Sequence, residues 1–273
     1  VGLAAWPRSE RPTALSGYGV DSEYGRVEAV LLAAPGCLDL VACNSVSRES
    51  LRLGRRAHAD RAARQHESLL EALAAEGVSV QILPALAGLP DLAFTRDSSL
   101  MTPWGLLGLR PGASHRQAEA EAVLVHARRA GVPLLGRIDR GRIEGGDISL
   151  VMPGLIAIGI SDERTDETGA EALAAIFRGQ GWRVVKYHFD PHFLHLDTQF
   201  CMAGDGLALA CTDVLDDAFL ATLAANGVAI ADVTYKEARR LGCNVLALGG
   251  RRVLSAGSAP RVDRALAEQG YRV

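Results

Sequence analysis

The sequence predicts an α/β protein whose repeated units close into a ring, a five-fold pseudosymmetric α/β-propeller around an axial pocket. Two observations predict this fold. A plan of two strands joined by a tight turn, then a helix and a further strand, occurs four times along the chain. An aspartate precedes the first three hairpins at a constant interval of 50 residues, at Asp97, Asp147 and Asp197, and Asn244 follows 47 residues later. Repeats of this length form rings or solenoids, and equivalent edges of a ring face its axis.

The N-terminal part predicts an incomplete unit of the same kind. It has a strand at 27–33, a long helix at about 55–76 and a strand at 78–83, which is one strand fewer than the plan requires. We interpret residues 1–20 as an N-terminal extension and residues 1–273 as a single domain.

The four units that follow have glycine-rich turns between their first two strands and apolar residues at three- and four-residue spacing in their helices. Their predicted strands and helices are 99–101, 106–109 and helix 115–129; 148–152, 155–159, helix 168–178 and strand 182–187; 198–202, 207–211, helix 216–225 and strand 228–232; and 244–248, 252–255 and helix 261–268. A doubly wound sheet is the alternative. That fold alternates single strands with helices, so it predicts no hairpin between successive helices.

The last unit has lost most of its final strand, because it breaks off at Tyr271-Arg272-Val273. Closed folds avoid unpaired strand edges. We therefore expect a segment beyond Val273 that adds a strand next to 27–33 and completes the ring.

Composition and charge favour a globular protein with a small-molecule ligand. The chain is 48% hydrophobic and 22% charged, and its net charge of -3 includes no basic run, which argues against nucleic acid and a membrane surface as partners. No apolar stretch is long enough to span a membrane, and the first residues lack a signal-peptide pattern, so we expect a cytoplasmic protein. The five cysteines are not spaced as a disulfide framework or zinc site. A homodimer is one option for the assembly.

Three motifs lie just before the hairpins: Asp91-Leu-Ala-Phe-Thr-Arg-Asp97, Glu144-Gly-Gly-Asp147 and His195-Leu-Asp197. In this order they resemble the penteins, a superfamily of arginine deiminases, dimethylargininases and amidinotransferases. The resemblance extends from Ser22-Glu23-Tyr24-Gly25-Arg26 to Tyr271. The blocks at 110–116 and 159–165 resemble those of the dimethylargininases in particular.

The resemblance implies a role for each motif. Carboxylates bind a planar guanidinium through paired hydrogen bonds, and the resemblance assigns this role to Asp97, Glu144 and Asp197. It makes His195 the general acid and base. The resemblance further implies that the substrate's α-carboxylate and α-amino group are bound by Arg116, Arg164 and Asp91. The alternative for Asp97 and Asp147 is a structural role at the turn backbone, and Asp147 is the stronger candidate for it.

The nucleophile of the family is a cysteine thiolate that forms a covalent amidino-enzyme intermediate. The resemblance places it in a glycine-rich segment after the last repeat, beyond Val273. Cys243 lies at a repeat edge and is the alternative, although asparagine recurs at this point of the family. Cys201 and Cys211 fall in apolar strands and are predicted core residues.

These inferences predict a hydrolase that cleaves a guanidino C–N bond of arginine or an Nω-methylated arginine and produces citrulline. The ligand is a small guanidino amino acid, and no metal or organic cofactor is implied. Asp197 favours an unsubstituted nitrogen, because a methyl group there leaves a buried charge unpaired. An amidinotransferase and a non-catalytic binding protein are the alternatives.

Overall fold

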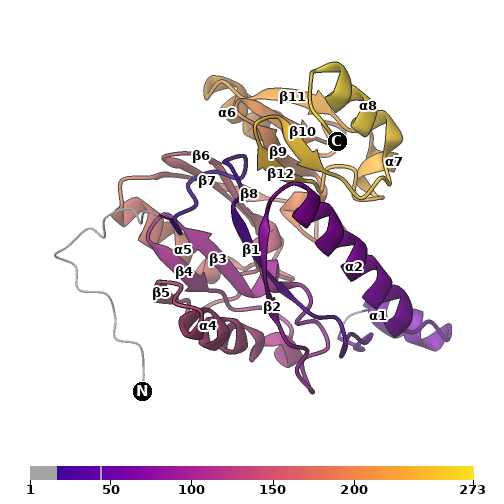
Figure 1. Ribbon diagram of the computed structural model, residues 1–273. Coiled ribbons are helices and arrows are strands. Elements are labelled where there is room, and N and C mark those ends of the chain that lie inside the picture. The colour runs from indigo at the N-terminus through magenta and orange to yellow at the C-terminus, as the bar shows by residue number, and fades with distance from the viewer. Residues whose placement is uncertain (1–16, 44) are drawn as a thin grey trace.

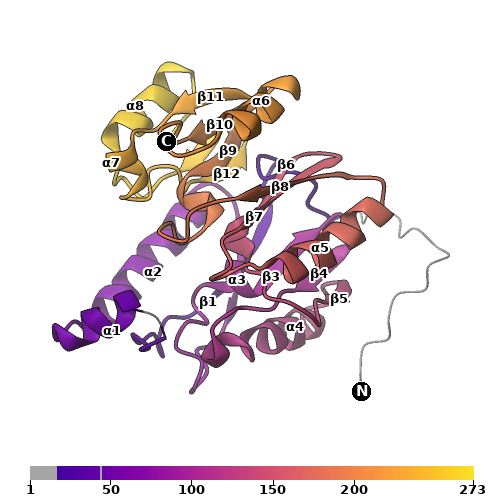
Figure 2. The ribbon, with the colours of Figure 1, turned by 180° about the vertical axis from the view of Figure 1, so that it is seen from behind.

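The computed structural model describes residues 17–43 and 45–273. In this part of the chain the strands form five small sheets. Figures 1 and 2 show the sheets grouped at the centre, with the main helices around their outer side. These helices are α2 (Ala59–Ala75), α4 (Glu119–Arg129), α5 (Glu167–Gly179), α6 (Asp217–Ala225) and α8 (Pro260–Glu268).

The three middle sheets have the predicted plan. In each, the first two strands form an antiparallel hairpin, and the third strand runs parallel to the second. Their strands are β3 (Ser99–Thr102), β4 (Gly105–Gly108) and β5 (Leu134–Arg137); β6 (Ile148–Met152), β7 (Leu155–Ile160) and β8 (Arg183–His188); and β9 (Phe200–Gly204), β10 (Leu207–Ala210) and β11 (Ala229–Asp232). Helices α4, α5 and α6 connect the second strand to the third, which confirms the repeated unit.

The first and last units each have a two-stranded sheet. In the first, β1 (Ala29–Ala33) pairs in parallel with β2 (Ser79–Leu83). In the last, β12 (Leu246–Gly249) pairs antiparallel with β13 (Arg252–Leu254), and Arg272 forms a parallel bridge to Arg252. Leu73, Val78 and Leu248 form one buried cluster across the two units. The ring therefore closes by side-chain packing between its first and last units.

Residues 20–27 connect several units by crossing them in turn. The backbone N–H of Val20 donates to Thr102, that of Glu23 to Leu150 and that of Val27 to Leu248, at 3.4, 3.0 and 3.3 Å. Gly249 allows the close approach at the last of these contacts, because a Cβ there would lie 2.6 Å from the Cα of Arg26. Of the predicted extension at 1–20, residues 1–16 lie outside the described part of the chain.

Three α-helices of the described residues were not predicted. They are α1 (Ser45–Arg52), α3 (Thr95–Ser98) and α7 (Tyr235–Ala238). A Thr-x-x-Glu signal for α7 was present in the sequence, since Thr234 and Glu237 form a capping box. The helix predicted at 115–129 was placed too early, because a separate 3-10 turn, η1 (Ser114–Arg116), precedes α4. Arg116, the last residue of that turn, is buried.

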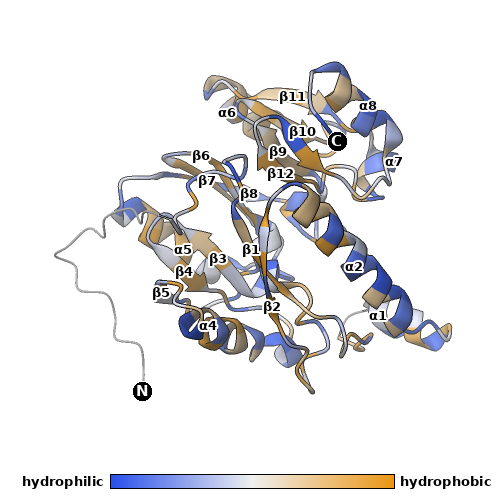
Figure 3. Ribbon diagram, in the orientation of Figure 1, coloured by the Kyte–Doolittle hydropathy of each residue, from blue (hydrophilic) through white to orange (hydrophobic). Residues whose placement is uncertain are grey.

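One large apolar cluster lies between α5 and the sheets of the second and third units. Phe177, fully buried, packs edge to face against Trp104 and Trp182, with ring centroids 5.3 and 5.1 Å apart. Figure 3 shows hydrophobic residues concentrated in the strands, whereas α2 carries long hydrophilic stretches. Among the described residues, no helix has the length and apolar character needed to cross a membrane.

Candidate active site

The three motifs before the hairpins each form one helical turn that leads into a strand. These turns are α3 (Thr95–Ser98), η2 (Gly145–Asp147) and η3 (Leu196–Thr198). Two glycines let the turns approach one another. A Cβ on Gly145 would lie 1.9 Å from the carbonyl oxygen of Arg96, and a Cβ on Gly146 would lie 2.6 Å from the ring of His195. The Gly-Gly pair is therefore required by its neighbours in space.

Asp97, Glu144 and His195 come together from three consecutive units, with polar atoms that lie within 4.8 Å of one another. Nε2 of His195 is 3.5 Å from Oε2 of Glu144 and 3.7 Å from Oδ1 of Asp97. These three residues were predicted to converge from separate repeats, and the geometry brings them together.

Glu144 is fully buried and has one oxygen without a hydrogen bond. The Gly112 N–H donates to Oε1 at 2.9 Å, while Oε2 has no hydrogen-bond partner. Three cationic groups lie just beyond hydrogen-bond distance of Oε2: His195 at 3.5 Å, Arg164 at 3.6 Å and Arg116 at 3.8 Å. Burial raises the pKa of Glu144, and the nearby Asp97 carboxylate raises it further. Oε2 is thus an acceptor that a donor-rich ligand would satisfy.

Asp147 binds His195 on the other side of its ring. Oδ1 of Asp147 lies 3.3 Å from Nδ1 of His195 and accepts the Leu196 N–H at 3.0 Å, and the Thr165 hydroxyl donates to Oδ2 at 2.6 Å. Burial alone would lower the pKa of His195. The hydrogen bond to Asp147 and the carboxylates of Asp97 and Asp147 outweigh burial and raise this pKa to about 9. His195 is therefore an imidazolium at neutral pH. The sequence had favoured a structural role for Asp147, and no sequence signal had connected it with His195.

Arg116 lies in a buried ion-pair network. Its guanidinium donates to Glu119 at 2.9 Å and to Asp97 at 2.8 Å, and its side chain is 4% exposed. Burial would raise the pKa of Asp97, but His195 and Arg116 outweigh it and lower that pKa. Because Glu119 and Asp97 already occupy the guanidinium, binding of a substrate carboxylate by Arg116 stays a prediction.

The other residues predicted for the substrate's α-groups lie nearby with different partners. Oδ2 of Asp91 forms a hydrogen bond with Nε2 of His115 at 2.7 Å. Arg164 is 14% exposed, and its guanidinium is 3.6 Å from Glu144. Arg164 follows a sharp turn in which Asp162 has a φ of 60°, a conformation that aspartate tolerates better than most residues. Neither role is tested by this geometry.

Asp197 forms an ion pair with Arg96, and Arg96 in turn forms one with Glu23. Nε of Arg96 donates to Oδ2 of Asp197 at 3.2 Å, and NH2 of Arg96 donates to Glu23 at 3.0 Å. Burial raises the pKa of Asp197 to about 6, although Arg96 and His195 oppose the rise. From the sequence, Arg96 and Glu23 were evident only as parts of motifs, because their contacts join segments far apart in the chain.

A family model described as N,N dimethylarginine dimethylhydrolase, eukaryotic, matches residues 40–266. The chain belongs to this dimethylarginine dimethylhydrolase family. Its fold agrees: a solved structure of dimethylarginine dimethylaminohydrolase from Pseudomonas aeruginosa, a cysteine-to-serine variant in complex with citrulline, superposes with a TM-score of 0.74 at 25% identity over 91% of each chain. The pentein ring predicted from the repeats is thereby confirmed.

Two sequence relatives extend this comparison. The N(G),N(G)-dimethylarginine dimethylaminohydrolase of Streptomyces coelicolor is 29% identical over 207 residues, which are 76% of this chain and 75% of the relative. The uncharacterized protein YkgA of Bacillus subtilis is 28% identical over 253 residues, 92% of this chain and 86% of the relative. The similarity to the dimethylarginine dimethylhydrolase family therefore extends over most of the molecule.

Three cysteines of this family member are buried and held as thiols. Burial raises the pKa of Cys201 to about 12, and it also raises the pKa of Cys211 and Cys243. Cys211 and Cys243 belong to one apolar cluster, which also contains the buried Leu266. Cys37 is half-buried and Cys43 is exposed.

Asp97, Glu144 and His195 are spaced closely enough to surround a cation. Two features favour an organic cation over a metal ion. Arg116 already binds Asp97, and a protonated His195 has no free lone pair on Nε2 with which to bind a metal ion. A flat cation with several N–H donors suits carboxylates arranged in this way, and we assign no metal here.

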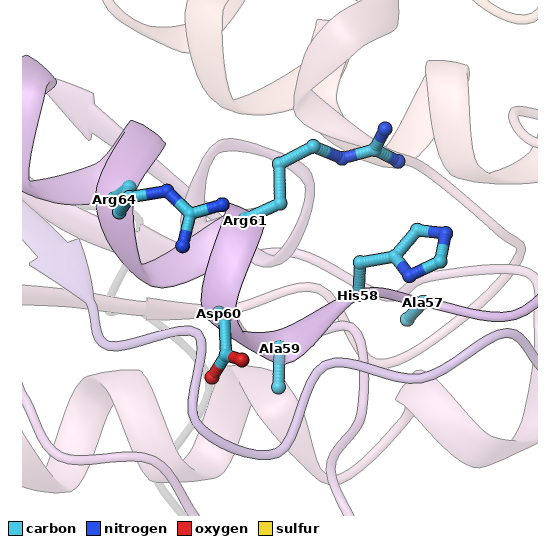
Figure 4. A pocket seen from close by; sticks show the side chains of 6 residues that line it. All are labelled: Ala57, His58, Ala59, Asp60, Arg61 and Arg64. Atoms are coloured by element: carbon cyan, nitrogen blue, oxygen red, sulfur yellow. The ribbon is translucent and has the colours of Figure 1, made fainter.

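Two hollows lie elsewhere in the molecule. One, of about 540 Å³, is formed at the start of α2, and Figure 4 shows its side chains pointing in different directions. The other, of about 330 Å³, lies between the turns at Gly204 and Gly250, beside Tyr24 and Tyr271. Neither hollow is lined by a predicted site residue of this dimethylarginine dimethylhydrolase family member.

Proposed function

We propose that the protein hydrolyses a guanidino C–N bond of arginine or an Nω-methylated arginine and releases citrulline with ammonia or an alkylamine. The observation that carries the proposal is the convergence of Asp97, Glu144 and His195 within 4.8 Å of one another, from three separate units. Membership in the dimethylarginine dimethylhydrolase family supports it. So does the citrulline complex of the Pseudomonas aeruginosa relative.

In the proposed reaction the carboxylates hold the guanidinium in place for attack. Oε2 of Glu144 would accept a hydrogen bond from the substrate, which removes the cost of a buried acceptor without a partner. Asp97 and Asp197 would grip the other nitrogens. Holding a flat cation between fixed carboxylates orients its central carbon toward a nucleophile.

His195 would move the protons. A thiolate attacks the guanidinium carbon, and the amine leaves as the C–N bond breaks and Nε2 of His195 gives it a proton. A water then attacks the amidino carbon while His195 accepts its proton, and the C–S bond breaks. Asp147 on Nδ1 keeps Nε2 directed at Glu144 and Asp97 throughout. A pKa near 9 makes His195 a proton donor at neutral pH.

The thiolate is the remaining requirement. Cys201, Cys211 and Cys243 have raised pKa values because they are buried, and a nucleophilic cysteine needs a lowered one. We therefore propose that none of these three buried cysteines is the nucleophile. Cys243→Ser should leave citrulline production within about two-fold. Loss of activity in this variant would make Cys243 the nucleophile.

The substrate is decided by Asp197. In a citrulline assay we expect arginine to be turned over faster than asymmetric dimethylarginine, because two methyl groups would leave Oδ1 of the buried carboxylate without a donor. Asp197→Ala should narrow this difference by about ten-fold or more, the effect of one unpaired charge.

The matched control is Asp190→Ala, since Asp190 is an exposed aspartate whose carboxylate accepts only the nearby His192 N–H. This variant should leave the ratio of the two rates unchanged. A clear preference of the wild type for asymmetric dimethylarginine would contradict the assignment of Asp197. Transfer of the amidino group to an added amine, with little citrulline, would instead identify an amidinotransferase.

A further inference from the structure

We propose that Glu23 is a positioning residue for Asp197 and that it acts through Arg96. The Ser22-Glu23-Tyr24-Gly25-Arg26 segment has no part in the chemistry described above, yet its carboxylate connects to the site in two steps. The inference rests on the proposed function only where it treats Asp197 as a guanidinium-binding carboxylate.

Glu23 is fixed on β6 of the third unit by its backbone N–H and by one oxygen of its carboxylate. Its N–H donates to the Leu150 carbonyl at 3.0 Å, and Oε2 accepts the Ser149 hydroxyl at 2.7 Å. Its other oxygen, Oε1, accepts NH2 of Arg96 at 3.0 Å. Ser149 is itself buried, so the carboxylate is held by a strand of the core.

Arg96 joins this anchor to the site. NH2 also donates to the Ile148 carbonyl at 3.2 Å, while Nε donates to Oδ2 of Asp197 at 3.2 Å. The side chain of Arg96 is 50% exposed, whereas those of Glu23 and Asp197 are 13% and 12% exposed. Without Glu23, therefore, the Arg96 guanidinium is free to rotate toward the solvent. The carboxylate of Glu23 holds this guanidinium against the protein surface, beside Asp197.

Arg96 affects both the orientation of the Asp197 carboxylate and its ionisation. Arg96 occupies Oδ2, which leaves Oδ1 for a ligand. Asp197 is also surrounded by groups that disfavour its ionised form: burial is the largest, and the carboxylates of Asp97 and Asp147 add to it. Two cations oppose them, Arg96 and His195. Removal of one of the two cations must raise the pKa of Asp197.

A structural role would not require a carboxylate at this position. The backbone bonds of residues 20–27 to three units already hold the segment. A neutral side chain could fill the same space. The negative charge matters only because its partner is a cation that reaches the site.

The test measures the pKa of Asp197 directly and needs no catalysis. Aspartate labelled with 13C at the side-chain carboxyl is incorporated, and the Asp197 signal is identified by its loss in Asp197→Asn. We expect Glu23→Ala to raise the pKa of Asp197 by about 0.5 pH unit or more, since Arg96 is released. Glu23→Gln, whose carbonyl still accepts from Arg96, should recover at least half of the difference. Ser149→Ala removes one hydrogen bond that anchors Glu23. This variant should also raise the pKa of Asp197, but by less than Glu23→Ala does.

The control is Asp21→Ala, which removes the same charge from the same segment. Asp21 is exposed and its carboxylate accepts the Ser22 hydroxyl, so the pKa of Asp197 should not move. If Glu23→Ala fails to fold, Glu23→Gln and Ser149→Ala carry the comparison. An unchanged or lowered pKa of Asp197 in the folded variants would overturn the proposal, because Glu23 would then act as structure or as a second negative charge. Failure of the protein to bind arginine at any pH would count against the proposed function and leave this result intact.

Discussion

Asp147 and His195 show how a single buried pair connects stability to protonation. His195 is almost fully buried among carboxylates, and its pKa of about 9 lies above the ordinary value of 6.5. Between these two values the folded state binds a proton that the unfolded state releases. The folded state is therefore favoured most below pH 6.5, and the advantage is lost as the pH rises through 9.

His195→Gln should remove this pH dependence. We expect the free energy of unfolding of the wild type to fall between pH 6.5 and 9 by up to about 3 kcal/mol more than that of the variant, as the shift in pKa requires. Urea unfolding at several pH values in this window measures it. The exposed His58→Gln variant is the control and should follow the wild type. Parallel curves for wild type and His195→Gln would show that His195 is not held as an imidazolium.

At the scale of elements, the contact between two repeated units depends on one aromatic cluster. Trp104 lies on the turn between β3 and β4, whereas Phe177 lies on α5 and Trp182 just before β8. Phe177 is fully buried between the two tryptophans, with its ring at 68° to Trp104 and 76° to Trp182. The helix of the third unit is thus packed against the hairpin turn of the second.

Phe177→Ala should destabilise the protein by about 3–5 kcal/mol, the usual cost of removing a fully buried aromatic ring. The matched variant Phe177→Leu keeps most of the volume and should cost about 1.5 kcal/mol or less. The shift of the denaturation midpoint, together with the change in tryptophan fluorescence, measures both. A cost below about 1 kcal/mol for the alanine variant would mean that the units are not held together here.

For the molecule as a whole, the repeat was visible in the sequence, and it therefore predicted the ring architecture. The alternation of hairpins and helices predicted the strands of the middle units except β5 (Leu134–Arg137), and the strand at 148–152 was placed at its observed bounds. The constant interval of the aspartates placed Asp97 near its partners before any coordinates, because equivalent edges of a ring converge.

The sequence could not supply contacts that depend on how distant segments meet. The bond between Glu23 and Arg96 spans 73 positions, and that between His195 and Asp147 spans 48. Neither pair has a spacing that a helix or strand would mark. The two glycines before Asp147 suggested a turn, while the neighbours that require them, Arg96 and His195, become evident only in three dimensions.

Ring closure is a further whole-molecule property that can be tested. Glu76, at the end of α2 in the first unit, accepts hydrogen bonds from Arg252 at 3.2 Å and from Arg272, both in the last unit. Glu76→Gln should lower the free energy of unfolding by about 1 kcal/mol, a partly exposed network of three charges being worth little more. The loss should shrink in 1 M salt. Glu49→Gln, which breaks an exposed pair within α1, should have no measurable effect. Equal effects of the two variants would contradict a role for Glu76 in closure.

The arrangement of one turn per unit around the acidic cluster also has a kinetic consequence. Each hairpin forms from neighbouring residues, but Asp97, Glu144 and His195 meet only after three units have docked. Loops this long close late, and folds rich in such distant contacts fold slowly. The repulsion between the carboxylates then arises after the main barrier. It would therefore shorten the lifetime of the native state without slowing its formation. The repulsion between like charges thus raises the unfolding rate and leaves the folding rate unchanged.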